Sequence, residues 1–421
     1  MKRFLLISLI AVTAPDHSAC AAARAQPRVA GITTVYHHNS HADVILSRLT
    51  QTDTLDFKGQ VLPVKLVSLY VDQFPANDIG RQIATNYNIP IFDRVGQALT
   101  LGGDKLAVDG VFLVAEHGKY KKSATGQTVF PKRRLFEQVV KVFEASGRVV
   151  PVFSDKHLAD NWTDAKWIYD QAKRLKIPMM AGSSIPVLWR YPTVDVKRGA
   201  KLKEILAVSY HTLDAYGFHA VEGVQALAER RAGGETGVAS VRTLVGDAVW
   251  EAGERGEWSP SLLDAALSRL KERPLPKNVT VRELMKKRRK DPILFTINYE
   301  DGLRAHIMTL NGAVAEWAAA WSYDEANAQI ESTLFWTQEA RPFHHFSHLL
   351  REVNRMMLTG KPSYPVERTL MTSGVLDACL ISMKNGGKLL ETPYLREVEY
   401  QSDWNWSQPP PPVPGRPIHG Q

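Results

Sequence analysis

Short apolar runs alternate with helix-like stretches through the first half of the chain. The runs that predict buried strands are residues 29–32, 64–71, 89–92, 108–115, 149–153 and 177–181. Apolar residues recur at helical spacing in residues 40–49, 77–87, 132–145 and 163–175. Strands separated by helices of this length indicate parallel β-α-β units, because a parallel connection must carry the chain back across the sheet. Residues 27–182 are therefore expected to form an α/β domain with a Rossmann-like, doubly wound parallel sheet.

Two of the expected helices begin with a residue that suits an N-cap. Ser40 precedes the first helix, and Thr163 opens the helix after the fifth strand, with Asp164 in its first turn. The polar residues 50–60 are typical of a loop inserted before the second strand. The first crossover is thus expected to be longer than the others.

The pattern changes after Ser184, where strand-like stretches are no longer each followed by a helix. Those stretches are residues 202–210, 238–248, 298–311 and 313–321, and Asp301-Gly302 in the third predicts a hairpin turn. Helices are expected at residues 259–272, 281–290, 344–359 and 366–384. Residues 183–400 are therefore expected to form an α+β domain with a mostly antiparallel open sheet. Residues 401–421, with prolines at 409–412, are expected to form a proline-rich extended tail.

Length and composition set the broad class of protein. A chain of 421 residues exceeds what one ordinary hydrophobic core supports, which agrees with two domains. Its hydrophobic (44%) and charged (23%) fractions are those of a soluble globular protein. The net charge of +8 includes no long basic run, and residues 286–290 are better explained as the end of a helix. Because no nucleic-acid-binding motif accompanies them, no nucleic-acid partner is expected.

The N-terminus has the features of an export signal. Lys2 and Arg3 precede the short apolar residues 4–12, and Ala23-Arg24-Ala25 has the A-x-A pattern of a cleavage site. The apolar segment is too short to span a membrane, so no transmembrane span is expected. We therefore expect residues 1–25 to be a signal peptide and the mature protein to be periplasmic or secreted.

Cysteine usage does not bear on export, which is inferred from the signal alone. The chain contains Cys20 and Cys379 only. A lipid anchor at Cys20 is the alternative to cleavage, but His17 is a poor residue three places before it. Cleavage before Gln26 removes Cys20, so the mature protein is expected to have no internal disulfide and no thiolate metal site.

The fifth predicted strand leads to the first candidate site residue. Residues 149–153 are apolar and are followed by Ser154-Asp155-Lys156-His157, where the chain leaves the strand. In an open parallel α/β sheet, ligands bind outside the carboxyl ends of the strands. Lys156 therefore lies where a ligand is expected, although a lone loop lysine is more often simply solvated.

The order of these elements, together with four stretches of sequence, resembles the Gfo/Idh/MocA family of dehydrogenases. The stretches are SLYVDQFPANDIGRQIATNYNIPIF, VDGVFLVAEHGKY, VVPVFSDKHLADNWTDAKWIYDQAKRLKIPMMAGSS and HFSHLLREVNRMMLTGKPSYPVERTLMTSGVLDACLISMKNGGKLLE. The family joins an N-terminal Rossmann domain to a C-terminal open sheet that carries substrate contacts and often the oligomer interface. The resemblance covers most of the mature chain. It implies an oxidoreductase that uses NAD or NADP on a hydroxyl of a sugar, sugar acid or cyclitol, and a homo-oligomer formed through the C-terminal sheet.

Two residues match positions that carry catalysis in the family. The family has Glu-Lys-Pro after its fifth strand, where the lysine touches the nicotinamide ribose and the substrate hydroxyl; Lys156 matches that lysine, with both neighbours changed. Relatives also carry D-x-G-x-H-x-x-D at a helix start. Gly217, His219 and Glu222 fit this pattern, whereas Ala215 replaces its first acid. The resemblance thus implies Lys156 and His219 as catalytic residues, and histidine suits proton transfer because its ordinary pKa lies near neutrality. A structural histidine at a helix start is the alternative.

The main departure from the family is the first turn of the Rossmann domain. Residues 31–41 read GITTVYHHNSH, so residues with side chains fill all three glycine positions of the G-x-G-x-x-G fingerprint. Those glycines normally let the backbone approach a pyrophosphate at a helix N-terminus. Asp72, after the second strand, is of the right type for a ribose hydroxyl, but it lies farther from the turn than usual.

Two accounts of this turn remain open. In the first, polar side chains replace the glycines and NAD(P) still binds. The cofactor-binding residues expected on this account are Thr33, Thr34, His37, His38, Asn39, Ser40, Asp72 and Lys156. In the second, the cofactor is lost and the cleft performs different chemistry. Export bears on the choice between these two accounts. Nicotinamide cofactor is scarce outside the cytoplasm, so an exported dehydrogenase should hold its cofactor tightly.

Further acid–base candidates lie at the same edge of the sheet. Glu116 and His117 follow the fourth strand and are expected to act as an acid/base pair, the alternative being a solvated turn. His37, His38 and His41 offer imidazoles that suit zinc or copper. Because the adjacent His37 and His38 cannot face one point from regular structure, no metal site is expected.

Three functions fit these observations. The first is the exported oxidoreductase. The second is a redox-neutral carbohydrate-active enzyme (a lyase, hydrolase or epimerase) that uses Lys156, His219, Glu116 and His117 as acids and bases. The third is a non-catalytic carbohydrate-binding protein. The lysine and histidine favour an enzyme, whereas the missing glycines favour the second and third functions. His345, on a predicted helix, is expected to be a packing or interface residue.

Overall fold

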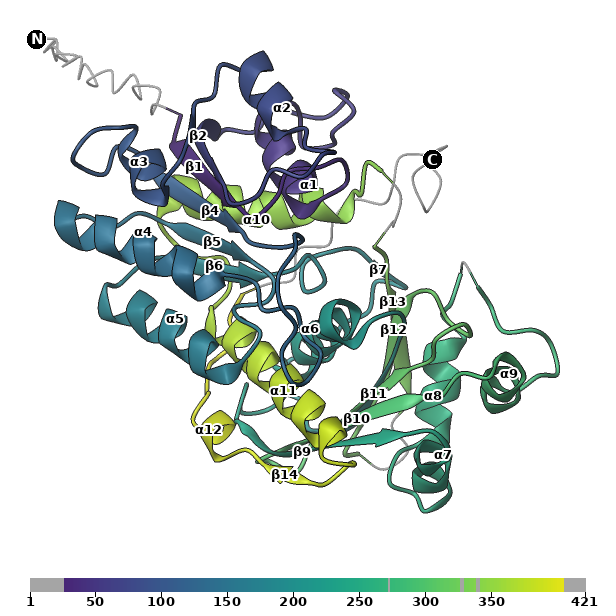
Figure 1. The fold of residues 1–421 in the computed structure, drawn as a ribbon. Coiled ribbons are helices and arrows are strands. Elements are labelled where there is room, and N and C mark those ends of the chain that lie inside the picture. Colours follow the sequence, from purple (N-terminus) through teal and green to yellow (C-terminus); the bar gives the residue numbers. More distant parts are fainter. Residues whose placement is uncertain (1–25, 272, 326–328, 338–340, 405–421) are drawn as a thin grey trace, which may run out of the picture.

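The computed structural model describes residues 26–271, 273–325, 329–337 and 341–404. The expected signal peptide, with Cys20, and the chain from residue 405 lie outside this range, so both stay predictions. Within it, two β-sheets are each covered by helices (Figure 1). None of the described helices is long and apolar enough to cross a membrane.

The first sheet has six strands, all parallel. Its strands are β1 (Arg28–Thr33), β2 (Lys65–Val71), β3 (Ile91–Phe92), β4 (Gly110–Val114), β5 (Val152–Asp155) and β6 (Met179–Gly182). The strand order is β3-β2-β1-β4-β5-β6, so the direction of winding reverses between β1 and β4. This confirms the Rossmann-like sheet and places the switch point, where ligands bind in such folds, between the ends of β1 and β4.

The helices of this sheet differ from the expected ones in a few details. They are α1 (His41–Leu46), α2 (Gly80–Asn86), α3 (Val95–Thr100), α4 (Lys132–Ser146) and α5 (Trp162–Arg174). The pattern does not reveal α3, because six residues are too few to show a helical period. Asn161, not Thr163, caps α5, since its side chain accepts a hydrogen bond from the Asp164 amide. Strand β5 begins after Pro151, which has no N–H for the ladder.

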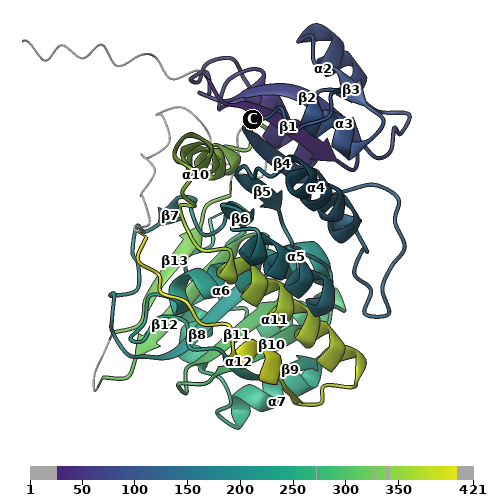
Figure 2. The same ribbon diagram turned by 90° about the vertical axis from the view of Figure 1, so that its left-hand side faces the viewer.

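Helices from distant parts of the chain cover the two faces of the first sheet. One face packs against α3, α4 and α5 in a core that includes Val111. The other packs against α1 and α10 (His345–Thr359), whose Phe346 and Leu350 join a core with Phe112. Figure 2 shows α10 and α4 on opposite sides of β4 and β5. A helix from late in the sequence therefore helps to complete the N-terminal part of the fold.

The second sheet has eight strands in the order β14-β9-β10-β11-β8-β12-β13-β7. They are β7 (Arg190–Tyr191), β8 (Leu202–Ser209), β9 (Val238–Val245), β10 (Ile293–Tyr299), β11 (Arg304–Thr309), β12 (Trp317–Tyr323), β13 (Glu331–Phe335) and β14 (Leu390–Glu391). Only the β11–β8 pair is parallel among these described strands. The expected mostly antiparallel sheet and the β10–β11 hairpin are therefore confirmed.

Both faces of the second sheet are covered. On one side lie α6 (Phe218–Ala228) and α11 (Glu367–Lys384), between the two sheets (Figure 1). On the other side, α7 (Asp247–Glu254), α8 (Pro260–Leu267) and α9 (Val281–Arg288) share a core with strand residues. Helices of this chain thus cover both faces of the sheet through which members of the resembling family often pair.

A buried ion pair joins the end of α6 to α11. The Arg368 guanidinium donates to both carboxylate oxygens of Glu229 at 2.8 Å, and neither side chain is exposed. Tyr400 also donates to Glu229, at 2.7 Å, and the Trp404 ring lies 4.5 Å from the Arg368 guanidinium. These contacts fix the last described residues of the chain on the C-terminal domain.

Candidate functional site

A cavity of about 690 Å³ lies beside the carboxyl ends of β4 and β5. Its walls come from the first turn, the loop after β4, the ends of β5 and β6, the start of α6, and α10. The four residues expected to be catalytic, Lys156, His219, Glu116 and His117, all line it. The fold therefore brings into one site residues that are far apart in the sequence.

Lys156 and Glu116 form a buried ion pair in the cavity wall. Lys156 Nζ lies 3.1 Å from Glu116 Oε2, and both side chains are almost wholly buried. Burial alone would lower the pKa of the Lys156 ammonium, but the charges of Glu116 and Asp155 outweigh it and raise that pKa. Burial would likewise raise the pKa of Glu116, yet the ammonium groups of Lys156 and Lys132 hold it well below its ordinary value. At neutral pH, Lys156 is thus a cationic hydrogen-bond donor and not a base.

A chain of hydrogen bonds holds His219, near the start of α6. Its Nδ1 lies 3.0 Å from Ser183 Oγ, and the Ser183 hydroxyl and amide both donate to Glu222. Because the Ser183 proton goes to Glu222, Ser183 Oγ accepts from Nδ1–H, which leaves the lone pair of a neutral His219 on Nε2. Burial, followed by the charge of Lys156, holds the pKa of His219 well below its ordinary value. His219 is therefore neutral at pH 7, and its Nε2 lone pair is available to accept a proton.

Glu222 at the far end of this chain is 1% exposed. Burial raises its pKa to about 7, against the opposing hydrogen bonds from Ser183. Gly182, at the end of β6, makes room for the carboxylate, since a Cβ at this position would collide with Glu222 Oε1. Gly182 also has φ of +109°, which side-chain-bearing residues rarely adopt. Glycine is thus required where β6 meets the site.

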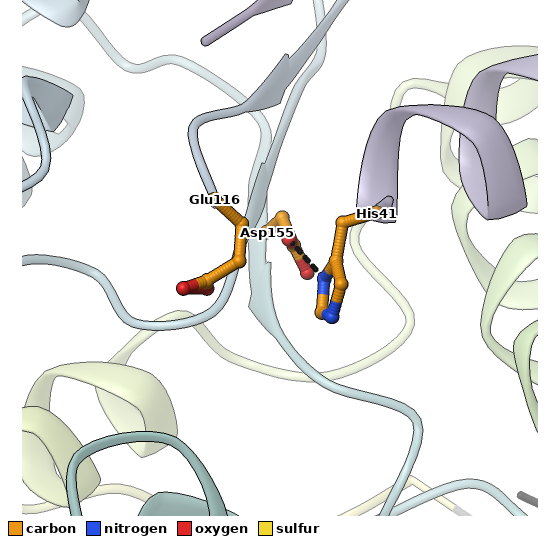
Figure 3. A group of neighbouring side chains, drawn as sticks. All are labelled: His41, Glu116 and Asp155. Atoms are coloured by element: carbon orange, nitrogen blue, oxygen red, sulfur yellow. Dashed lines mark hydrogen bonds and ion pairs between the residues drawn. The ribbon is translucent and has the colours of Figure 1, made fainter. Parts of the chain in front are cut away.

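A second histidine–carboxylate pair joins the first turn to the end of β5 (Figure 3). His41 Nδ1 lies 2.6 Å from Asp155 Oδ2, and the Asp155 side chain is 1% exposed. The rings of His117 and Phe346 meet the His41 ring edge-on, with centroids 5.2 and 5.4 Å away. Ligand atoms of His41, Glu116 and Asp155 lie within 4.8 Å of one another. Among the described residues, this is the group that could hold a metal ion, and it includes neither His37 nor His38.

The two threonines expected to meet a pyrophosphate are engaged within the protein. Thr33 Oγ1 lies 3.1 Å from the Val35 carbonyl oxygen and 2.9 Å from that of Val114. Thr34 Oγ1 donates to the Glu116 carbonyl at 2.7 Å. Both threonines are fully buried. Their hydroxyl protons therefore hold the turn against β4.

The rest of the turn is organised around the buried carboxylate of Asp43. The Asn39 amide donates to it at 2.9 Å, and Ser40 caps α1 by accepting from the Asp43 amide. Arg341 forms an ion pair with the same carboxylate at 2.6 Å, and His38 lies 3.7 Å from it with its ring largely exposed. An acidic side chain is thus bound where the fingerprint of the family would present amides to a phosphate.

The chain before α2 packs against this turn as well. The amides of Ile79 and Gly80 both donate to the Tyr36 carbonyl, and His37 forms a β-bridge with Asp78. This pairing explains why α2 begins at Gly80 and not at residue 77, as the pattern predicts. The His37 ring bonds the main chain of His38 and does not line the cavity.

Asp72, the expected ribose ligand, is already bonded to three donors. Tyr70 and Tyr120 donate to it at 2.7 Å, and Arg134 donates at 2.6 Å. Tyr120 belongs to the loop after β4, which therefore lies over the end of β2. A carboxylate accepts about four hydrogen bonds, so little capacity remains. Asp72 does not line the cavity.

These contacts decide how a dinucleotide fits the described residues. The cavity that holds Lys156 and His219 fits the nicotinamide half. The pyrophosphate would meet the Asp43 carboxylate, and the adenosine ribose would meet an Asp72 that must first release its internal donors. The residues present therefore fit the nicotinamide half well and the adenosine half only after rearrangement.

The fold also brings to the cavity groups that the pattern of the sequence does not reveal. Ser183 and Ser184 follow β6, so the rule that ligands bind at strand ends could have found them. His345, expected to be a packing or interface residue, lies in the cavity wall and bonds Ser184 Oγ at 2.7 Å. Trp317 meets the His219 ring edge-on with centroids 5.2 Å apart, a contact that no local signal predicts.

Comparison with known proteins gives the fold. No family model and no curated protein matches the chain. Among solved structures, the NAD complex of GenD2 from gentamicin A biosynthesis has 13% identity and a TM-score of 0.56, covering 91% of this chain and 99% of its own. The apo scyllo-inositol dehydrogenase from Lactobacillus casei has 10% identity and a TM-score of 0.54, covering 87% and 99%. The myo-inositol 2-dehydrogenase from Lactobacillus plantarum has 11% identity and a TM-score of 0.52, with the same coverage.

These likenesses confirm the fold expected from the sequence, that of the Gfo/Idh/MocA-type dehydrogenases. At such low identity they show the shared architecture and leave the chemistry to the residues of this chain. Those residues include a lysine after β5 and a histidine near the start of α6, both in the same cavity.

Proposed function

We propose that the protein is an oxidoreductase that acts on a hydroxyl group of a sugar, sugar acid or cyclitol, with NAD or NADP as the hydride carrier. The observation that carries this proposal is that Lys156 and His219 line one cavity beside the switch point of a dehydrogenase fold. The inositol dehydrogenases and the NAD complex among the solved structures with this fold support it.

Lys156 and His219 have complementary roles in this proposal. Lys156, kept cationic by Glu116, donates a hydrogen bond to the substrate oxygen and stabilises the negative charge that develops there. His219 accepts the hydroxyl proton at Nε2, while Ser183 and Glu222 hold its ring in the required tautomer. Bound NAD(P) supplies the hydride acceptor.

The lining of the cavity supports a polyhydroxylated substrate. Aromatic rings of Tyr216, Trp317 and Phe346 lie among hydrogen-bonding groups in its wall. Apolar faces next to polar groups suit a sugar or cyclitol ring, which has C–H faces and hydroxyl edges. We therefore include sugars, sugar acids and cyclitols in the proposed substrate class.

A second candidate function keeps the same residues and drops the cofactor. The observation that favours it is that Thr33, Thr34 and Asp72 make their hydrogen bonds within the protein. In this alternative, Lys156, His219, Glu116 and His117 act as acids and bases in a lyase, hydrolase or epimerase reaction on a carbohydrate.

Cofactor content separates the two candidates. The protein is purified after natural processing and denatured, and the supernatant is assayed by mass spectrometry for NAD(H) and NADP(H). The apo protein is then titrated with each dinucleotide. Near-stoichiometric dinucleotide, or saturable binding, supports the oxidoreductase and directs screening to sugar and cyclitol oxidation. No dinucleotide and no binding at millimolar concentration would remove the oxidoreductase and leave the redox-neutral reaction.

We also propose that the protein is exported and cleaved before Gln26. The charged start, the short apolar segment and the Ala23-Arg24-Ala25 pattern support this. N-terminal sequencing of the protein isolated from the periplasm or medium tests it. A protein that keeps its first residues in the cytoplasm would contradict the proposal.

A further inference from the structure

Two buried ligand-type atoms at or next to the cavity make no hydrogen bond. Asp155 Oδ1 and His117 Nδ1 are both buried, and neither has a partner among the described residues. A carboxylate oxygen without a donor is costly to bury, so such an atom indicates a group that is bound there in the working protein. Asp155 gives the stronger indication of a bound group, because the whole residue is only 1% exposed.

Asp155 lies in a group of ligand-type residues from three parts of the chain (Figure 3). His41 comes from the start of α1, Glu116 follows β4, and Asp155 ends β5. One ligand atom from each lies within 4.8 Å of the others. Two ligands of one ion with bonds of about 2.0–2.2 Å lie at most about 4.4 Å apart, so small side-chain rotations bring all three onto one ion.

We propose that His41, Glu116 and Asp155 bind one divalent first-row transition-metal ion, with His117 as a further ligand. One or two imidazoles with two carboxylates suit Zn²⁺, Mn²⁺ or Fe²⁺, and the set contains no thiolate. The 5.2 Å between the ring centroids of His41 and His117 agrees with two imidazoles on one tetrahedral ion, for which about 5 Å is expected. This inference goes beyond the proposed oxidoreductase activity and does not depend on it.

The two ammonium groups near Asp155 do not donate to its carboxylate. The ammonium of Lys156 is bonded to Glu116. Lys132 lies nearby, but its Nζ donates to the main-chain oxygens of Asp155 and Lys156 at 2.8 and 2.7 Å. The Asp155 carboxylate therefore has His41 as its only side-chain partner among the described contacts. A divalent ion would satisfy Oδ1 and share the Glu116 carboxylate with the Lys156 ammonium, which is bonded to one of its two oxygens.

This shared carboxylate gives the proposal a distinctive test. An ammonium beside Glu116 repels a metal ion, so replacing it with a neutral side chain of similar length should strengthen binding. Lys156→Met is therefore expected to bind the ion at least as tightly as the wild type. Asp155→Asn and His41→Gln, which remove ligands, are each expected to weaken binding at least about tenfold. His211→Asn is the matched control: His211 is exposed, lines the same cavity, has φ of +65° that asparagine tolerates, and lies outside the ligand group.

Untagged protein, stripped with EDTA, is titrated by calorimetry with Zn²⁺, Mn²⁺ and Mg²⁺, and Co²⁺ absorbance reports the ligand field. Circular dichroism establishes that each variant is folded. One site per chain for Zn²⁺ or Mn²⁺, weakened in Asp155→Asn and His41→Gln and unchanged in His211→Asn, supports the assignment. No binding by the wild type at millimolar metal, equal binding by folded Asp155→Asn, or weaker binding by Lys156→Met would overturn it. Because these readouts need neither substrate nor dinucleotide, they stand apart from the test of the proposed function.

Discussion

The buried carboxyl of Glu222 should make the stability of this protein depend on pH in a way that one substitution removes. Burial raises its pKa from 4.5 to about 7. A carboxyl with a raised pKa in the folded state holds its proton more tightly when folded. The folded state is therefore favoured by this group at low pH, and that advantage falls as pH rises from about 4.5 to about 7. Glu222→Gln keeps an acceptor for Ser183 and never ionises.

The size of the effect follows from the pKa shift. Each pKa unit corresponds to about 1.4 kcal/mol, so a shift of about 2.5 units penalises the ionised form by about 3 kcal/mol above pH 7. Between pH of about 5 and about 8, the wild type should lose about 2–3 kcal/mol that the variant does not lose. One core joins both sheets, so the described chain unfolds as one unit of about 370 residues, and this loss corresponds to a change of roughly 3–4 °C in Tm.

Thermal unfolding of wild type and Glu222→Gln, followed by circular dichroism at several pH values, measures this difference. Every other titrating group is common to the two proteins, so only the difference between their Tm values is informative. We expect this difference to grow in favour of the variant as pH rises. Two curves that run parallel from pH of about 5 to about 8 would refute the raised pKa of the buried Glu222 carboxyl.

Further predictions concern the site, the core and the assembly. His219→Asn should lower kcat by about 10²–10⁴-fold on the substrate, with a smaller change in KM and a folded structure by circular dichroism; a kcat within threefold of wild type would contradict its role as proton acceptor. Glu229→Gln should reduce the free energy of unfolding by about 3–5 kcal/mol in urea, because Arg368 would stay buried without its ion-pair partner, whereas a loss below about 1 kcal/mol would contradict that account. Gly182→Ala should destabilise the protein and disturb Glu222, and normal stability would show that β6 can shift. The mature protein should be monomeric in light scattering, since α7, α8 and α9 cover the outer sheet face; a dimer would show that another surface is used.

The sequence was sufficient for the fold because the fold depends on local periodicity. Apolar runs followed by helical spacing can satisfy their buried faces only in a parallel doubly wound sheet, and the strand order agrees with this. The hairpin at Asp301-Gly302 likewise follows from local turn chemistry. Lys156 and His219 could be identified because the short motifs that contain them resemble those of a known family.

The pattern of the sequence predicts short elements and helix starts less well than it predicts the two sheets. Asn161 competes with Thr163 for the cap of α5, and only the backbone conformation decides which side chain reaches the Asp164 amide. The start of α2 depends on hydrogen bonds to the Tyr36 carbonyl, which the pattern within residues 77–87 cannot reveal.

Tertiary structure alone decided how the candidate residues are used. Thr33, Thr34 and Asp72 are polar residues at strand ends, which suits cofactor binding, but their hydrogen bonds go to Val114, Glu116 and Tyr120 across the sheet. The pairing of His41 with Asp155 likewise depends on the packing of distant segments. So does the burial of the outer face of the second sheet. In each case the deciding contact joins residues far apart in the chain, and periodicity along a sequence carries no information about such pairs. The sequence by itself therefore determined the architecture and the two residues that resemble a catalytic pair, and the packing of distant segments determined which polar groups remain free to act.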